Sequence, residues 1–590
     1  MKLGRISAAL MPFAVLAGCS TTSSAPPRAQ AAGLADPPLP PPPPPPPPGA
    51  VDMQRMSEIT RVLASDDFQG RAPGTAGETK TVAYLVDQFK SAGLEPGGEN
   101  GGWTQAVPMI RSQLGQPMKI SVAQSGQATA LRDPEDIYLG TVRPVDRVRI
   151  AAAPMVFVGY GVTAPERGWD DFKGVDLHGK VLVMLVNDPD FEAAAGEPVA
   201  GKFGGKAMTY YGRWAYKYEE AARRGAIAAL VVHETDAAGY PWKVVQSPAG
   251  ESYNVVLPAG AQQPVLLQGW IQRSVAEALL KRAGRDYDAV KRDARTAAFR
   301  PIDLKARFTA DIPVTVTPIQ SQNVIGKLTG ATRPDETISY GGHWDAYGIG
   351  PADAQGRTIR PGAADDALGL AAMIEIGRAF ASGPRPARTL VFAAWTGEER
   401  GLLGSSYYAQ HPLYRPEKMA ANLTLDTLQW AGPVKDVVLI GKGQSQMEDI
   451  LAEEAARQGR YVTEEGHPER GLFYRADHFS FAKLGVPVLL DMALAGAYDM
   501  VDGGREAGEK WLSDFTATCY HQTCDRWSPS WDLRGAAQEA ELFYAIGARL
   551  ANSADWPQWY PQSEFAKVRQ KSASERGEPG GRGGGERGRR

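Results

Sequence analysis

The clearest amphipathic pattern of the chain lies near the start of its globular part. Within Glu78–Ala92, apolar residues recur at helical spacing and would share one face of a helix: Val82, Leu85, Val86 and Phe89. Gly93 follows directly, at the position where a left-handed glycine commonly ends a helix. The sequence therefore predicts a helix over Glu78–Ala92.

A longer alternation of strands and helices begins at about Asn323. The short apolar runs typical of buried strands are Thr337–Tyr340, Thr389–Ala394, Asn422–Leu425, Val437–Ile440 and Val486–Leu490. Helical periodicity falls between and after them, at Ala367–Phe380, Glu399–Ala409, Met447–Gln458 and Ala536–Ala551. This alternation predicts an α/β fold, a three-layer αβα domain with a mixed, largely parallel sheet. In such sheets, ligand sites lie at the carboxyl ends of the strands.

The pattern changes between residues 146 and 305. Strand-like runs there are Met155–Val158, Val181–Val186 and Ala226–Val232, and a helix is predicted over Trp214–Arg224. We expect this region to be a smaller α/β or β-rich domain inserted into the larger one. The larger domain would then be discontinuous and comprise residues 51–145 and 306–560.

The first nineteen residues have the pattern of an export signal. Lys2 and Arg5 precede an apolar stretch, Ile6–Ala17, that is too short for a stable membrane span. The segment Leu16-Ala17-Gly18-Cys19 resembles a bacterial lipobox and predicts lipidation at Cys19; the alternative is an ordinary signal peptide that contains a cysteine. Ser20 follows instead of Asp, which in such lipoproteins is typical of sorting to the outer membrane. We expect an envelope lipoprotein that faces the periplasm and touches the membrane only through its lipid.

Composition adds limits to this picture. Residues 20–50 are Pro-rich, with nine consecutive prolines at 40–48, and we expect a disordered tether there, as well as a disordered Gly/Arg-rich tail over 561–590. About 510 of the 590 residues remain, enough for one large and one medium domain. A net charge of −3 argues against a general nucleic-acid binder, and three cysteines exclude a multi-disulfide scaffold.

Acidic residues and histidines cluster where the predicted strands and helices meet. The motifs are His343-Trp344-Asp345, Asp365-Asp366, Glu398-Glu399, Asp426, and Cys519-Tyr520-His521 with Cys524 and Asp525. Each motif alone has an ordinary explanation, such as a surface turn or a helix cap. Together they supply the imidazole and carboxylate ligands that zinc prefers, including the shared ligand of a two-zinc site. His478 is a further candidate for a contact behind the ligands.

The order of these motifs resembles exopeptidase family twenty-eight of the metallopeptidases, which contains double-zinc aminopeptidases and relatives of glutamate carboxypeptidase. The resemblance covers about residues 55–555 and includes the Gly70–Gly77 segment, and the insert resembles a protease-associated domain. It implies peptide substrates and two zinc ions per chain. Two departures from the family are a longer stretch between His343 and Asp365, and Ala476 where many relatives have Ser.

The resemblance also implies a role for each residue. The implied ligands are His343 and Asp426 for one zinc ion, Glu399 and His521 for the other, and Asp365 as the bridge. Glu398 would be the general base, and Tyr520 would donate a hydrogen bond to the oxyanion. Asp345 would accept a hydrogen bond from the second ring nitrogen of His343 and so fix its tautomer.

Cys519 and Cys524 flank the predicted ligand His521. Their spacing alone allows a disulfide, two free thiols or thiolate metal ligands. Export to an oxidising compartment favours the disulfide, and secreted relatives carry one at the matching spacing, so the resemblance implies a bond.

An exported zinc aminopeptidase is the function that the resemblance implies. The alternative within the fold is a carboxypeptidase or dipeptidase, which would bind a substrate carboxylate with arginine; the candidates are Arg357, Arg360, Arg470 and Arg475. Two full ligand sets disfavour a single-zinc acyltransferase. A surface-tethered binding protein without catalysis is the alternative from another class, and metal analysis separates the two.

Overall fold

The computed structural model describes residues 50–246 and 250–577. The predicted export signal, Cys19 and all but the last residue of the predicted tether lie outside the described residues. No helix in the described part has the length and apolar content that a membrane crossing requires.

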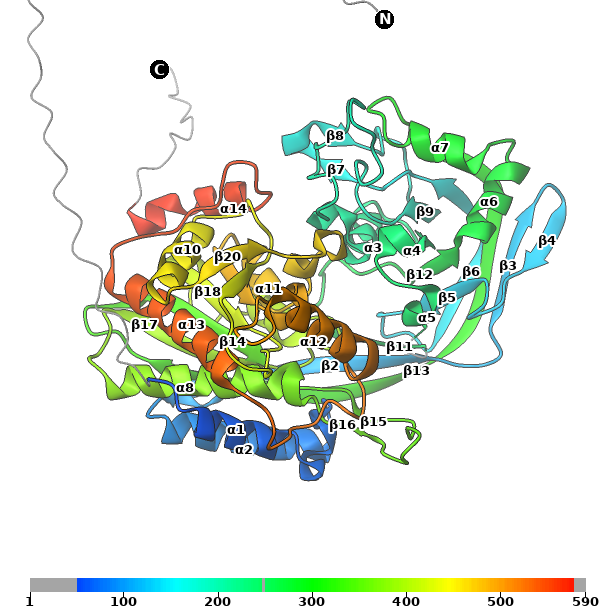
Figure 1. The fold of residues 1–590 in the computed structure, drawn as a ribbon. Helices are drawn as coiled ribbons and strands as arrows, with labels where there is room; N and C mark the ends of the chain where they lie inside the picture. Colours follow the sequence, from blue (N-terminus) through cyan, green and yellow to red (C-terminus); the bar gives the residue numbers. More distant parts are fainter. Residues whose placement is uncertain (1–49, 247–249, 578–590) are drawn as a thin grey trace, which may run out of the picture. The chain divides into compact units, whose positions relative to one another are not determined.

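The main sheet carries the order β21, β18, β14, β17, β13. Figure 1 labels all of these strands except β21. These strands are β21 (Val488–Asp491), β18 (Met419–Leu425), β14 (Arg333–His343), β17 (Arg388–Trp395) and β13 (Ile302–Leu328). The first four run parallel, and β13 is antiparallel to β17. The mixed, largely parallel sheet is thus confirmed. The predicted strand Val437–Ile440 is an exception, because β19 (Asp436–Leu439) pairs with β20 (Tyr461–Glu464) in a separate two-stranded sheet.

Helices cover both faces of this sheet. Along β17, Leu390, Phe392 and Ala394 belong to one core, whereas Val391, Ala393 and Trp395 belong to another. The first core receives residues from α1 (Met53–Leu63), α2 (Ala76–Ser91), α8 (Leu368–Ser382), α10 (Met447–Arg457) and α13 (Arg534–Asn552). The second core receives residues from α9 (Leu403–Gln410), α11 (His478–Ala482) and α12 (Gly504–Thr518). Alternate side chains of a strand point to opposite faces, so the three-layer αβα arrangement is confirmed.

A second sheet, with cores of its own, forms the inserted unit. Its parallel strands are β6 (Arg147–Phe157), β9 (Val181–Leu185), β10 (Ala228–His233) and β12 (Leu267–Gln272). Its helices are α3 (Trp214–Arg223), α4 (Thr235–Ala238), α5 (Trp242–Val245), α6 (Arg273–Arg282) and α7 (Tyr287–Asp293). Of the two predicted alternatives, α/β or β-rich, the unit is therefore the α/β one.

The predicted boundary of the insert at residue 146 is wrong. The strands β3 (Lys119–Gln124), β4 (Gln127–Ala130) and β5 (Ile137–Gly140) all pair within the second sheet. The cause is β13, whose first half pairs with β3 and β6 and whose second half pairs with β17 and with β2 (Thr104–Leu114). Because one unbroken strand belongs to both sheets, the local sequence has no break at the boundary.

The prediction of a disordered tail from residue 561 is wrong for its first part. Residues 561–577 include α14 (Ala566–Lys571), and Phe565 is buried. Arg569 is only 1% exposed and donates a hydrogen bond to the carbonyl of Met419, at the start of β18. Two buried side chains therefore attach this segment to the main domain, although its sequence is polar.

Candidate metal centre

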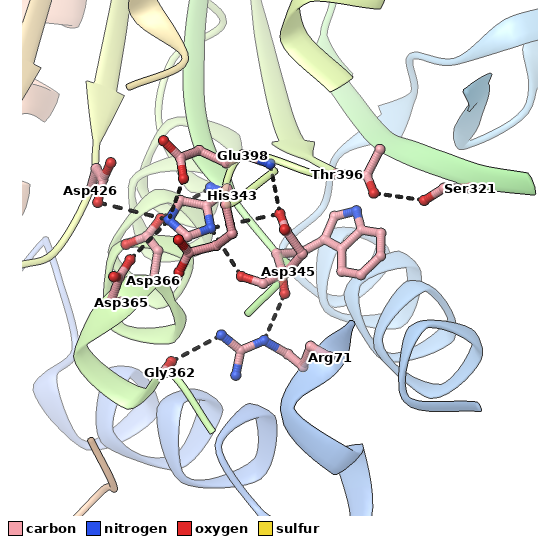
Figure 2. Close-up of polar contacts among 12 residues, drawn as sticks. Arg71, Ser321, His343, Asp345, Gly362, Asp365, Asp366, Thr396, Glu398 and Asp426 are labelled. Atoms are coloured by element: carbon pink, nitrogen blue, oxygen red, sulfur yellow. Dashed lines mark hydrogen bonds and ion pairs between the residues drawn. The ribbon is translucent and has the colours of Figure 1, made fainter. Parts of the chain in front are cut away.

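Three neighbouring parallel strands bring the predicted site residues to one edge of the sheet. β14 ends at His343, β18 ends immediately before Asp426, and β17 ends three residues before Glu398. β14 lies between β17 and β18, so the three carboxyl ends are adjacent (Figure 2). The site thus lies where a parallel sheet is expected to place one.

The helix predicted over Glu399–Ala409 begins too early. α9 starts at Leu403, because Gly401 and Leu402 have φ angles of 110° and 59° and turn the chain away from a helix. The two glutamates consequently lie in a loop before the helix. Glu398 Oε2 is 4.0 Å from His343 Nε2, and Glu399 Oε2 is 3.4 Å from His521 Nε2.

Asp365 lies between the two histidines. Its Oδ1 is 3.0 Å from Nε2 of His343, and its Oδ2 is 3.1 Å from Nε2 of His521. Asp426 Oδ1 lies 3.8 Å from His343 Nε2 and belongs with His343 and Asp365 to one group of donors. The two oxygens of one carboxylate thus face two separate groups of donors.

Two sets of donor atoms could each hold a metal ion. Within each set, all donor atoms lie within 4.8 Å of one another. The first set is His343, Asp365 and Asp426, and the second is Asp365, Glu399 and His521. Imidazole nitrogen with carboxylate oxygen is the donor chemistry of zinc. All five predicted ligands are therefore brought together, and Glu398 belongs to neither set.

The negative charge of this cluster also favours the binding of cations. Burial raises the pKa of Glu398 and of Glu399 well above the usual range, and neighbouring carboxylates add to the increase. Burial acts in the same direction on Asp365, but its hydrogen bonds with His343 and His521 outweigh that effect and lower its pKa well below the usual range. Several buried carboxylates this close are costly without a compensating positive charge, which metal ions would provide.

The prediction that the side chain of Asp345 accepts a hydrogen bond from His343 is wrong. Nδ1 of His343 is 3.0 Å from the backbone oxygen of Asp345 and 3.8 Å from its carboxylate Oδ1. That carboxylate oxygen instead accepts a hydrogen bond of 3.0 Å from the backbone N–H of Glu398. Asp345 therefore orients His343 through its main chain and holds the Glu398 loop through its side chain.

Sequence reasoning assigned no role to three residues that support the site (Figure 2 shows two of them, Arg71 and Asp366). Asp366 accepts hydrogen bonds from the backbone N–H groups of His343 and Thr427. Asp525 accepts from the backbone N–H groups of Ala364 and Asp365. The fully buried Arg71 donates to four backbone carbonyls, those of Leu63, Trp344, Pro361 and Gly362. The only sequence indication was the position of these residues inside or beside the quoted motifs.

A small, partly open pocket lies beside the second donor set. It is lined by Ala346, Tyr347, Arg360, Gly362, Asp365, Glu399, His521, Gln522 and Asp525. The longer stretch between His343 and Asp365 forms a hairpin, β15 (Gly348–Ile349) with β16 (Ile359–Arg360), which contributes Arg360 to the lining. Of the other arginine candidates, Arg357 pairs with Asp353, and Arg475 lies close enough to Tyr520 for its charge to oppose the increase that burial causes in the pKa of Tyr520.

Tyr520 lies against the neighbouring His521, with ring centroids 3.6 Å apart. Burial raises the pKa of Tyr520 well above its usual value, so its hydroxyl keeps its proton at neutral pH and can act as a donor. His478, by contrast, is 2.6 Å from the backbone oxygen of Phe473 and lies in neither donor set. Burial lowers its pKa to about 3, so it is a neutral core histidine.

Cys519 and Cys524 form a disulfide, with their Cα atoms 5.0 Å apart. The bond closes a short turn that contains Tyr520 and His521. His521 has a φ angle of 61°, in the left-handed region that non-glycine residues seldom adopt. The disulfide thus constrains the turn that presents a predicted ligand.

We expect the Cys519→Ser/Cys524→Ser double variant to lose zinc from the His521 side. Its zinc content should fall from about two ions per chain toward one, because the turn around His521 is no longer fixed. Its melting temperature should change little, since such a short loop gives a disulfide its smallest entropic effect. Elemental analysis and calorimetry check both statements. A lower melting temperature with full zinc content would contradict this view.

Comparisons with known proteins agree with this geometry. Residues 323–545 match the model of peptidase family M28. A probable zinc metalloprotease of Pyrenophora teres f. teres is 38% identical over 120 residues, which are 20% of this chain and 25% of that protein. Another, from Pyricularia oryzae, is 41% identical over 93 residues, 16% of this chain and 18% of that protein. The chain thus spans about a quarter or less of the length of these curated relatives.

Among solved structures, an aminopeptidase from Aneurinibacillus sp. strain AM-1 is similar at 20% identity, with a TM-score of 0.47 over 86% of this chain and 96% of that one. The family match covers the candidate metal centre. All five metal-facing residues and Glu398 fall inside the matched segment.

Proposed function

We propose that this protein is a metallo-exopeptidase, most specifically an aminopeptidase, that holds two zinc ions per chain. The observation that carries the proposal is Asp365, whose two carboxylate oxygens lie 3.0 and 3.1 Å from two different histidines. A carboxylate shared in this way is the expected bridge of a co-catalytic metal pair. The match of residues 323–545 to peptidase family M28 and the similarity to probable zinc metalloproteases support the choice of zinc.

The zinc pair, when bound, would lower the pKa of a water molecule and polarise the scissile carbonyl. Glu398 lies beside His343 without belonging to either donor set, so it is free to accept the proton of the attacking water and to return it to the leaving amine. The backbone hydrogen bond to Asp345 holds the Glu398 loop against the strand that carries His343. Tyr520, protonated at neutral pH, is the donor for the negative charge that develops on the carbonyl oxygen.

Asp525 supports the choice of an aminopeptidase over a carboxypeptidase. Besides Asp365 and Glu399, whose charges the zinc ions would compensate, the pocket is lined by the carboxyl group of Asp525 and by one arginine, Arg360. A carboxylate that binds no metal can attract the protonated α-amine of a peptide. The substrate would therefore place its amino terminus there and its first peptide bond at the metal pair.

One peptide, offered with a free and with an acetylated amino terminus, tests this proposal. We expect residues to be released in order from the free amino terminus, no cleavage of the acetylated peptide, loss of activity with a chelator, and recovery with zinc. Mass spectrometry identifies the products. Release of residues from the carboxyl end of the acetylated peptide would establish a carboxypeptidase instead.

We also propose that the protein is an envelope lipoprotein anchored at Cys19, on the lipobox-like Leu16-Ala17-Gly18-Cys19 segment. Cys19→Ala should leave the protein in the soluble fraction, with the specific activity of the purified enzyme unchanged, because the anchor is remote in sequence from every site residue. Fractionation under high salt checks the expectation. A variant that still sediments with membranes would require a different anchor.

A further inference from the structure

Arg400 follows the predicted ligand Glu399 directly, and its guanidinium lies between two tyrosine rings. The Cζ atom of Arg400 is 5.0 Å from the ring centroid of Tyr347 and 5.1 Å from that of Tyr253. Stacking on two aromatic faces fixes the plane of the guanidinium group.

Within the described residues the side chain of Arg400 makes no hydrogen bond and no close ion pair, although its positive charge partly offsets the increase that burial causes in the pKa of Asp345 and of Glu399. No carboxylate oxygen in residues 50–246 or 250–577 lies within 4.0 Å of its nitrogens, and its buried Nε makes no hydrogen bond. Arginine is the side chain best suited to bind a carboxylate with two parallel hydrogen bonds, and Arg400 makes none within the described residues. Arg400 thus has free donors in a fixed orientation.

The two tyrosines come from distant parts of the chain. Tyr347 follows β14, lines the pocket, and lies against His521 with ring centroids 4.5 Å apart. A single aromatic ring therefore separates the guanidinium from a predicted metal ligand.

Tyr253 belongs to β11 (Glu251–Val255), which lies in sequence between two strands of the insert but pairs with β2. Val255 of the same strand packs into an apolar cluster with Leu403, the first residue of α9. The inserted region thus supplies one wall of the tyrosine pair that holds Arg400.

We propose that Arg400, held between Tyr253 and Tyr347, binds a carboxylate of the substrate beside the metal centre. In a dipeptide, the free α-carboxylate lies only about one residue, roughly 3.5 Å of chain, beyond the scissile bond. The same chemistry could come from an acidic side chain at that position. This inference rests on the proposed function, and it makes the inserted region part of the substrate site.

Three substrates separate the sources of the carboxylate: alanyl-alanine, alanyl-alanine amide, and alanyl-glutamate with an amidated α-carboxyl. For Arg400→Met we expect KM to rise at least tenfold for the carboxylate substrate that Arg400 binds. KM for alanyl-alanine amide should stay within twofold, and kcat should change little, because the lost contact is to a non-reacting part of the substrate. Arg400→Lys should recover only part of the affinity, since it keeps the charge but loses the planar fork.

Tyr253 provides the matched pair of variants. Tyr253→Leu should raise KM for the same carboxylate substrate, whereas Tyr253→Phe keeps the aromatic face and should resemble the parent. Arg385→Met, which removes an exposed arginine paired with Glu95, is the control for loss of a positive charge. Zinc content and melting temperature of every variant show whether the fold is retained.

An equal loss for all three substrates in Arg400→Met, or no change at all, would overturn the carboxylate-binding role. If the parent protein hydrolyses none of them and also releases no residue from the peptide with a free amino terminus, the proposed function fails separately. Calorimetric titration of zinc-loaded Glu398→Gln protein with the same three compounds then still measures binding. A preference for a carboxylate that disappears in Glu398→Gln/Arg400→Met supports the inference, and absence of that preference refutes it.

Discussion

Glu398→Gln is expected to reduce kcat by about 10²–10⁴-fold while both zinc ions stay bound. The glutamine has nearly the same shape but cannot accept the proton of the attacking water. Glu398 lies 4.0 Å from His343 Nε2 and belongs to neither donor set, so the variant should leave both sets intact. The loop should also keep its position, because Asp345 holds it through the backbone N–H of residue 398.

Steady-state kinetics together with elemental analysis of the same sample measure both effects. Glu417→Gln, which changes a glutamate outside the site, is the matched control and should behave as the parent. Loss of zinc from Glu398→Gln would make Glu398 a ligand and transfer the role of the base to another residue. Full activity with both ions bound would remove Glu398 from the mechanism.

Much of the main domain could be predicted because its strands and helices alternate with clear periodicity. β14, β17 and β18 coincide with buried apolar runs of the sequence. His343, Glu398 and Asp426 lie at or shortly after the carboxyl ends of these strands. The boundary of the insert could not be predicted, because β13 runs through both sheets without an interruption in its pattern. The folded structure of residues 561–577 could not be predicted, because it depends on partners distant in sequence. One such partner is the carbonyl of Met419, to which Arg569 donates a hydrogen bond.

The identity of the metal-facing residues was accessible from the sequence, but the way they are held was not. The main-chain contact of Asp345 with His343 depends on a local turn that residue types do not specify. The start of α9 was predicted too early, because the helical periodicity begins before Gly401, whose positive φ angle prevents a helix there. Arg400 stacks between Tyr347 and Tyr253, which lie about 50 and 150 residues before it in the sequence. This contact could therefore be recognised only in the folded structure.

Asp365→Ala is expected to lose both zinc ions together. Asp365 contributes one oxygen to each donor set, so its removal weakens both sites at once, and each set is left with only two protein ligands. Loss of an outer-shell partner alone commonly costs about 10–100-fold in metal affinity, and loss of a direct ligand should cost more than that at both sites. Asp426→Ala and His521→Ala are the matched comparisons, because each removes a ligand from only one set.

Elemental analysis of the three variants after dialysis against the same free zinc concentration distinguishes a bridge from a terminal ligand. Asp365→Ala should retain close to no zinc, whereas Asp426→Ala and His521→Ala should each retain about one ion per chain. Far-ultraviolet circular dichroism and melting temperature must show that Asp365→Ala is folded, which we expect because the Asp525 contact to the backbone N–H of residue 365 does not need its side chain. One ion retained in folded Asp365→Ala would mean that Asp365 serves a single metal, and the two-zinc mechanism would lose its central ligand.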